Sequence, residues 1–145
     1  MKSERGFSLI ELVTVMVLVG ILAGAVIGSS VPSSSLQLQS SRDTIVAVFN
    51  SAQQLAMNRT SAVRLITAEN SVDIRIDTND DGNFSAAESI TYAGIQYPLS
   101  LPSTHTLSAV DFDFDRLGHT SSTTLVLSQG ANVVSLAVSA AGYIR

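Results

Sequence analysis

Residues 6–28 read GFSLIELVTVMVLVGILAGAVIG, and Glu11 is the only charged side chain in this stretch. The run from Phe7 to Gly28 is otherwise apolar or small. It is long enough to cross, as one helix, a bilayer hydrocarbon core of roughly 30 Å. The hexapeptide MKSERG with its two cations precedes the run, and the next charge is Arg42. Because positive flanks stay in the cytoplasm, the sequence predicts a single membrane helix with an exported C-terminal side.

The composition of the whole chain limits what it can be. It has 145 residues, a formal net charge of −4, a mean hydropathy of +0.33 and no cysteine. This length suits one modest domain, and a mildly acidic chain is a poor partner for nucleic acid. The absence of cysteine excludes disulfides and thiol chemistry. No spacing of His, Ser and Asp typical of a catalytic site occurs, so the sequence predicts no enzyme.

Glu11 separates three interpretations of the apolar run. A cleaved secretory signal explains the Ala-Gly-Ala at residues 23–25, and a plain membrane anchor explains the length of the run. Neither uses a carboxylate, which is costly in a membrane helix unless it has a partner. A cut between Gly6 and Phe7 would create an α-amino group that could be this partner.

The residues GFSLIE at 6–11 resemble the prepilin processing motif of type IV pilin-like proteins. The resemblance implies that a prepilin peptidase cuts after Gly6 and that Phe7 is N-methylated. It also implies that Glu11 meets the N-terminal amine of a neighbouring subunit during fibre assembly. The implied partners are other pilins or pseudopilins, the peptidase and an inner-membrane assembly platform. The implied location is the bacterial inner membrane, with a cytoplasmic N-terminus and a periplasmic C-terminal domain, and then a fibre.

Three glycines four residues apart follow in the same run. Gly20, Gly24 and Gly28 would share one face of a helix and let another helix approach closely. One interpretation is a packing stripe used in the membrane or in a fibre core. The other is that glycine is simply common in membrane helices.

The rest of the chain predicts an α+β fold. The sequence SSVPSSS interrupts the helical pattern at Pro32, and an amphipathic helix then runs from about residue 36 to 59. Short Val-, Ile- and Thr-rich segments separated by turn residues predict an antiparallel β-sheet laid against this helix. The expected parts are a leader at 1–6, a transmembrane assembly helix at 7–28, a kink and periplasmic helix at 29–60 and a periplasmic β-sheet domain at 61–145. The expected strands are 62–67, 72–77, 89–92, 110–115, 123–128 and 133–139, with a last edge at 139–145.

Three downstream segments resemble a narrower subfamily, the H-type minor pseudopilins of type II secretion and their type IV pilus relatives. They are QQLAMNRTSAVRLIT at 53–67, FDRLG at 114–118 and VSAAGYIR at 138–145. The resemblance implies a minor pseudopilin at or near the tip of a type II secretion pseudopilus. The alternatives are a minor pilin of a type IV or mannose-sensitive-type pilus and, in another class, a secreted or membrane-anchored calcium-binding domain.

Residues 77–88 fit the calcium-loop template D-x-[DN]-x-[DN]-G-x5-E. The flanking sequences are typical of strands, whereas an EF-hand needs helices. A polar hairpin that caps its own backbone is therefore the competing interpretation. The expected calcium ligands are Asp77, Asn79, Asp81, Asn83, Ser85 and Glu88.

The remaining polar residues have ordinary explanations. Asp111, Asp113 and Asp115 alternate with two phenylalanines, which predicts a strand with its rings buried and its carboxylates exposed. His105 and His119 lie in turn-like contexts, and we expect both to be solvated.

Overall fold

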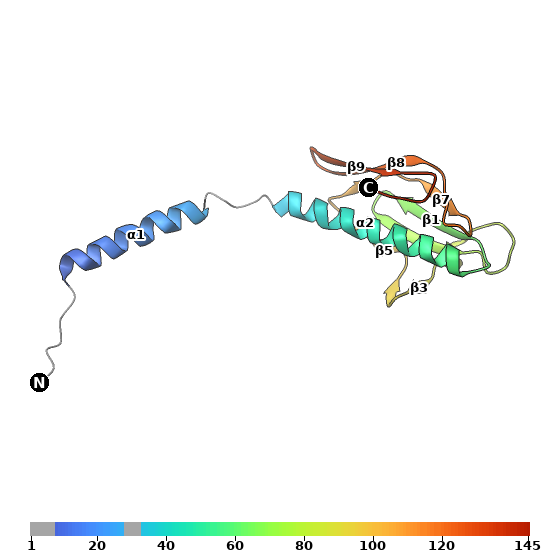
Figure 1. Ribbon diagram of the computed structural model, residues 1–145, viewed down its shortest axis with the longest axis horizontal. Helices are drawn as coiled ribbons and strands as arrows, with labels where there is room; N and C mark the ends of the chain where they lie inside the picture. The colour runs from blue at the N-terminus through green and yellow to red at the C-terminus, as the bar shows by residue number, and fades with distance from the viewer. Residues whose placement is uncertain (1–7, 28–32) are drawn as a thin grey trace, which may run out of the picture. The chain divides into compact units, whose positions relative to one another are not determined.

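The computed structural model describes residues 8–27 and 33–145, which fall into two compact units divided after Pro32. In the first unit, helix α1 spans Leu9–Ile27 (Figure 1). Within the described residues, no helix combines the length and the mean hydropathy required of a membrane span. The predicted interruption at Pro32 lies outside the described residues.

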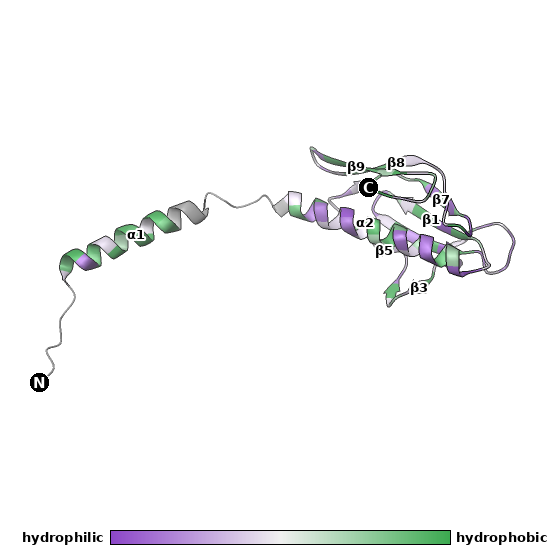
Figure 2. Ribbon diagram, in the orientation of Figure 1, coloured by the Kyte–Doolittle hydropathy of each residue, from purple (hydrophilic) through white to green (hydrophobic). Residues whose placement is uncertain are grey.

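The second unit begins with helix α2, Ser33–Asn58, which is amphipathic as predicted. Apolar residues that recur every three or four positions along it are buried, while most of its exposed positions are polar (Figure 2). Full burial of a large apolar side chain contributes about 1.5–3 kcal/mol, so this stripe is a major part of the domain's stability. The predicted and observed stripe is Ile45, Val48, Phe49, Ala52, Leu55 and Ala56.

The chain after α2 forms short antiparallel strands and one turn of 3-10 helix at Ala86–Glu88. The strands are β1 Val63–Ala68, β2 Ser71–Ile76, β3 Thr91–Tyr92, β4 Ile95–Gln96, β5 Leu99–Ser100, β6 Thr106–Leu107, β7 Asp111–Phe114, β8 Thr123–Gln129 and β9 Asn132–Val138.

These strands form three sheets, with the orders β5-β2-β1-β7, β3-β4 and β6-β8-β9. Two hairpins organise the larger sheets. The β1–β2 hairpin pairs Val63 with Ile76, and the β8–β9 hairpin pairs Thr123 with Val138. Gly130, in the turn of the second hairpin, has a φ of 60° that favours glycine.

Helix α2 packs against both larger sheets, contacting β1, β2, β7, β8 and β9. The core lies between the helix and the strands and is continuous across them. Phe49 of α2 is its centre, because its ring meets Phe112 edge-on at 5.4 Å and Phe114 at 5.1 Å between centroids. Phe112 and Phe114 are buried and Asp111 and Asp113 are exposed, which confirms the alternation predicted for this strand.

The structure differs from the sequence prediction between residues 95 and 110. Strands β4, β5 and β6 were not expected there, and each is only two residues long, too short for a periodic pattern. The chain passes from one sheet to another in this region. Ser108 N donates to Val126 O of β8, whereas Val110 O accepts from Thr67 N of β1, which lies in a different sheet. This change divides the strands between sheets where the sequence predicted one.

Candidate functional site

The first turn of α1 carries Glu11, the residue that the sequence predicts to direct assembly. Glu11 is exposed in that turn, and within the described residues it forms no ion pair. Thr14, one turn later, donates its hydroxyl to the carbonyl oxygens of Ile10 and Glu11 at 2.7 and 3.0 Å. The Thr14 hydroxyl is therefore satisfied within the helix, whereas the Glu11 carboxylate is available to a partner. Gly6 and Phe7, the predicted processing site, lie outside the described residues.

The large apolar side chains of α1 between Leu9 and Leu22 are 47–81% exposed. Gly20 has open space where a Cβ would lie, and Gly24 is helical, while Gly28 lies outside the described residues. Gly20 follows Glu11 by nine residues, which places the two about 180° apart around an α-helix. The helix thus presents a carboxylate on one side and a small residue on the other, both open to neighbours.

The carboxylates of the 77–88 loop bind the loop's own backbone. Asp77, which is buried, accepts from the N–H groups of Asp81 and Gly82 at 3.2 and 2.9 Å. Asp81 in turn accepts from Asn83 N at 2.7 Å and from the Asn79 amide at 2.8 Å. This is the pattern of an Asx-rich turn, in which short side chains replace missing backbone partners.

Glu88 closes the other end of the loop. Its Oε2 accepts from the N–H and hydroxyl of Ser85 at 2.8 and 3.0 Å, and its Oε1 accepts from Thr78 N at 3.2 Å. The bonds from Ser85, chiefly that from its backbone N–H, lower the pKa of the Glu88 carboxyl, because they stabilise its ionised form. Within the described residues, no three acidic or histidine side chains gather in a way that could hold a metal ion. The calcium ligand set thus stays a prediction from the sequence.

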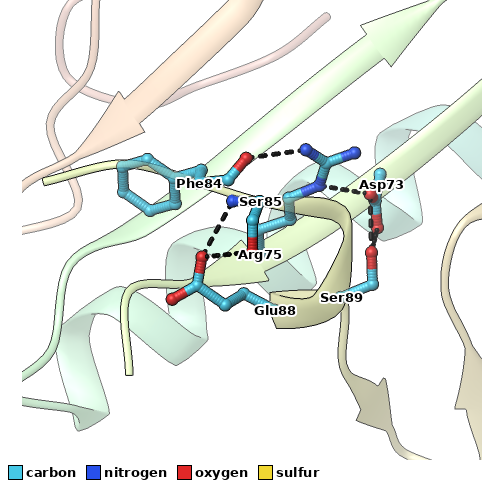
Figure 3. A network of polar contacts seen from close by, with 6 residues as sticks. All are labelled: Asp73, Arg75, Phe84, Ser85, Glu88 and Ser89. Carbon is cyan, nitrogen blue, oxygen red and sulfur yellow. Dashed lines mark hydrogen bonds and ion pairs between the residues drawn. The ribbon is translucent and has the colours of Figure 1, made fainter. Parts of the chain in front are cut away.

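A polar network anchors the same loop to β2 (Figure 3). Asp73, only 4% exposed, accepts from Arg75 Nε at 2.6 Å and from the Ser89 hydroxyl at 2.7 and 2.8 Å. Arg75 also donates through Nη1 to Phe84 O at 2.7 Å. Because the buried carboxylate is paired and hydrogen-bonded, its burial is tolerated. The network was not evident from the sequence, because Ser89 is sixteen positions from Asp73.

Phe84 is held from a second side by Arg64 on β1. The Arg64 guanidinium lies 4.3 Å from the centroid of the Phe84 ring and also pairs with Asp113 on β7, with Nη2 3.0 Å from Oδ2. The hydrogen bonds to Asp113 raise the pKa of Arg64. Arg64 on β1 and Arg75 on β2 therefore both hold Phe84 in place. The carboxylates of the loop accept hydrogen bonds from the loop's own backbone.

Two turns at the end of the domain lie against one another. Asp115 accepts from the N–H groups of His119 and Leu117, both at 2.8 Å, and these bonds lower the pKa of its carboxyl, the bond from His119 most. Gln53 of α2 donates to Gly118 O at 3.0 Å. Gly142, with a φ of 78°, packs so closely that a Cβ there would overlap the Gly118 carbonyl. The FDRLG and VSAAGYIR segments thus meet at one corner.

One expectation about histidine was wrong. His119 is half-exposed and pairs with Asp115, but His105 is 2% exposed and packed in the domain. His105 lies in the segment between β5 and β6, where the sequence has no periodicity that would indicate burial.

Comparisons with known proteins bear on the N-terminal segment and on the fold of the chain. Residues 1–27 match the family model of the prokaryotic N-terminal methylation motif. Two crystal structures of the type IV minor pilin FimU from Pseudomonas aeruginosa have similar folds. Their TM-scores are 0.56 and 0.51, each at 17% identity, and they cover 78% and 74% of this chain and 90% of the FimU chain. No curated protein sequence matches significantly. The chain therefore carries an N-terminal methylation motif at residues 1–27 and has a fold similar to that of a type IV minor pilin.

Proposed function

We propose that this protein is a minor subunit of a type IV pilin-like filament, with a structural rather than a catalytic role. The observation that carries the proposal is one chain with both an N-terminal methylation motif at residues 1–27 and a minor-pilin fold. In this proposal a prepilin peptidase cuts after Gly6, Phe7 is N-methylated, and residues 7–28 hold the precursor in the inner membrane until assembly.

The exposed side chains of α1 support an assembly role. A helix whose large apolar residues from Leu9 to Leu22 are all exposed needs lipid or other helices around it. The Glu11 carboxylate is the only charge on this helix. In a low-dielectric setting its attraction to the Phe7 amine of a neighbouring subunit would be much stronger than in water. The pair would thus set the axial register between subunits.

The exposed face of α2 also suits a filament interior. Ala47, Asn50, Gln54 and Met57 follow one face of the helix and are exposed. No charged residue occurs between Asp43 and Arg59. Depletion of charge is typical of the centres of protein interfaces, so this face can pack against another subunit without burying an unpaired charge.

Two filaments remain candidates. The sequence resemblance favours a type II secretion pseudopilus. The similar solved structures are of a type IV minor pilin, which supports a type IV pilus instead. Deletion of the gene separates them. Loss of export of a folded substrate with surface pili intact supports the pseudopilus, and loss of surface pili with export intact supports the pilus.

Processing tests the proposal directly. Co-expression of the full chain with a prepilin peptidase should yield a mature protein that starts at Phe7 and carries one N-methyl group, read by mass spectrometry of the intact protein. A Gly6→Ala variant should keep its leader, and a Thr14→Ala variant should be processed normally. A mature start between residues 23 and 29 would instead indicate an ordinary secretory signal and would overturn the proposal.

A further inference from the structure

We propose that the free edge of β9 binds an extended segment of another polypeptide chain, which adds a strand to the β6-β8-β9 sheet. The segment that fits is uncharged and rich in β-branched residues, apart from one carboxylate that faces Arg145. This inference concerns the fold of residues 33–145 and does not depend on the proposed filament role. It rests on two open backbone positions, on the chemistry of the edge and on a hollow beside it.

Strand β9 lies at the end of its sheet, where β8 pairs with one of its two sides. On the other side, Ala137 exchanges both backbone hydrogen bonds with Arg145, at 2.8 and 3.1 Å. Alternate residues of an antiparallel strand direct their N–H and C=O groups to the same side. Because the pairing with β8 has no bulge, Val133 and Ser135 direct theirs to the side of Ala137. Within residues 33–145, no backbone group pairs with Val133 or Ser135 on this side.

This edge lacks the features that keep strands from pairing with other chains, such as short length, charge, proline or a bulge. Among the described strands, the other sheet ends have at least one of them. β7 carries the exposed Asp111 and Asp113, and β3, β4, β5 and β6 are each two residues long. By contrast, β9 has seven residues, and residues 120–144 contain no Asp, Glu, Lys, Arg or Pro. The β9 edge is therefore suited to pairing with an extended backbone.

The side chains around the open positions favour an uncharged, β-branched segment. Val133 is 60% exposed, and Val126, opposite Ser135 on β8, is 39% exposed. An added strand would place alternate side chains beside Val133 and Ser135 on this outer face. The side chains between them would lie beside Val134, which packs against the core. Both rows are half-buried pleated surface, which β-branched residues fit well.

A hollow of about 340 Å³ adjoins the open positions, and it is lined by Ala137, Val138, Ser139, Tyr143 and Arg145. Arg145 is exposed and, within the part of the chain that the structure describes, forms no ion pair. A residue opposite Ser135 in an antiparallel added strand would lie two positions from Arg145 along the same line. Its side chain would therefore share a face with the Arg145 guanidinium. A carboxylate there would orient the segment more than it would strengthen binding, because exposed ion pairs contribute little.

A second copy of this chain fits the edge less well than a single segment does. Antiparallel pairing of two β9 strands through both open positions would place Val133 opposite Ser135 of the second copy. The same register would place Ala131 of the second copy opposite Ala137, where Arg145 already lies. Ala131 belongs to the tight turn between β8 and β9, so this turn would meet Arg145. A single extended segment has no such turn and can end beside Arg145.

Titration of the full chain in detergent micelles with a synthetic peptide tests the proposal. The probe is acetyl-Thr-Asp-Val-Ile-Thr-amide, whose Asp is placed opposite Ser135 and whose Ile is placed opposite Val133. Backbone ¹⁵N NMR should show shifts and slowed hydrogen exchange at the amides of Val133 and Ser135, and no change at Asp111–Phe114 of β7. We expect a Kd on the order of 1 mM, since main-chain hydrogen bonds supply most of the affinity in this mode of binding.

Two matched pairs separate backbone pairing from loose contact. The same peptide with N-methyl groups on its Asp and Ile amides cannot donate to β9 and should not bind. Ser135→Pro removes an N–H that points away from β8, and its ring obstructs an added strand, so the Kd should rise at least about tenfold. Ser135→Thr keeps the N–H and should bind as the wild type does. Arg145→Gln should abolish the preference for the Asp peptide over its Asn analogue.

Three results would overturn the inference. The first is that Val133 and Ser135 do not respond at about five times the expected Kd. The second is equal binding of the N-methylated peptide to the wild type, and this comparison decides the matter if Ser135→Pro does not fold. The third is protection of both amides in the peptide-free chain together with a dimer that Ser135→Pro abolishes, which would assign the edge to a second copy.

Discussion

Gly142 and Gly130 form a matched pair that tests the corner between the two C-terminal turns. Both have positive φ, 78° for Gly142 and 60° for Gly130, so an alanine at either position must adopt a left-handed backbone conformation. That strain costs about 1–2 kcal/mol for a residue with a Cβ. The two sites differ in space: a Cβ at Gly130 meets nothing, whereas one at Gly142 overlaps the carbonyl oxygen of Gly118 and the amide of Gln53.

The overlap adds to the strain at Gly142. To relieve it, the two turns must separate, which breaks the 3.0 Å hydrogen bond from Gln53 to Gly118, worth about 1 kcal/mol net. It also loosens the packing of both turns on α2, so we expect a total loss of at least about 3 kcal/mol for Gly142→Ala. The matched Gly130→Ala should cost only the strain of about 1–2 kcal/mol.

Urea unfolding of the two variants, followed by circular dichroism in micelles, measures this difference. The expected result is that Gly142→Ala is less stable than Gly130→Ala by at least about 1–2 kcal/mol, with similar dependence on urea. Equal losses in the two variants would show that the turns do not meet as described.

Three further predictions concern the core and the loop at residues 77–88. Phe49→Ala should destabilise the domain by about 3–5 kcal/mol in the same urea assay, because it leaves a cavity beneath Phe112 and Phe114, and Phe49→Leu should cost clearly less; a loss under 1 kcal/mol would exclude this core. The Glu88 carboxyl has a lowered pKa in the folded state, so it stabilises the domain above its ordinary value of 4.5 and loses this contribution as the pH falls through the lowered value. The free energy of unfolding of Glu88→Gln should therefore fall less steeply below pH 4.5 than that of the wild type. The same pH dependence in both proteins would refute the contacts between Glu88 and Ser85. Because the loop carboxylates already bind backbone N–H groups, millimolar Ca²⁺ should leave the Tm unchanged; a rise in Tm that disappears in Asp81→Ala would establish the calcium site instead.

The helix and the long hairpins could be predicted from the sequence because each has a strong local signal. The α2 stripe repeats every 3.6 residues over several turns, and the β1–β2 and β8–β9 strands are bounded by clear turn residues. The region from residue 95 to 107 gave no such signal, because its strands are two residues long and held by contacts distant in the sequence. That is why His105 was wrongly expected at the surface. The Asp73–Ser89 contact was not predicted because its two residues lie sixteen positions apart.

At the N-terminal site, the sequence provides more information than the structure does. The order of residues around Glu11 was sufficient to indicate a processing and assembly motif, and a family model matches the same segment. The structure adds that the Glu11 carboxylate is exposed and forms no ion pair within residues 8–27 and 33–145, whereas the Thr14 hydroxyl is satisfied by its own helix. This difference supplies a control for the assembly experiment.

The measurement that tests filament assembly most directly is incorporation of Glu11 variants into sheared filaments from cells that lack the wild-type gene. We expect Glu11→Ala to be processed and to stay in the membrane fraction, with at least a tenfold loss from the filaments, about 1.4 kcal/mol or more of assembly free energy. Thr14→Ala should be incorporated as the wild type is. Incorporation of Glu11→Ala at the wild-type level would contradict the proposal that this carboxylate directs assembly, and absence of the wild-type chain from every filament fraction would contradict the filament role itself.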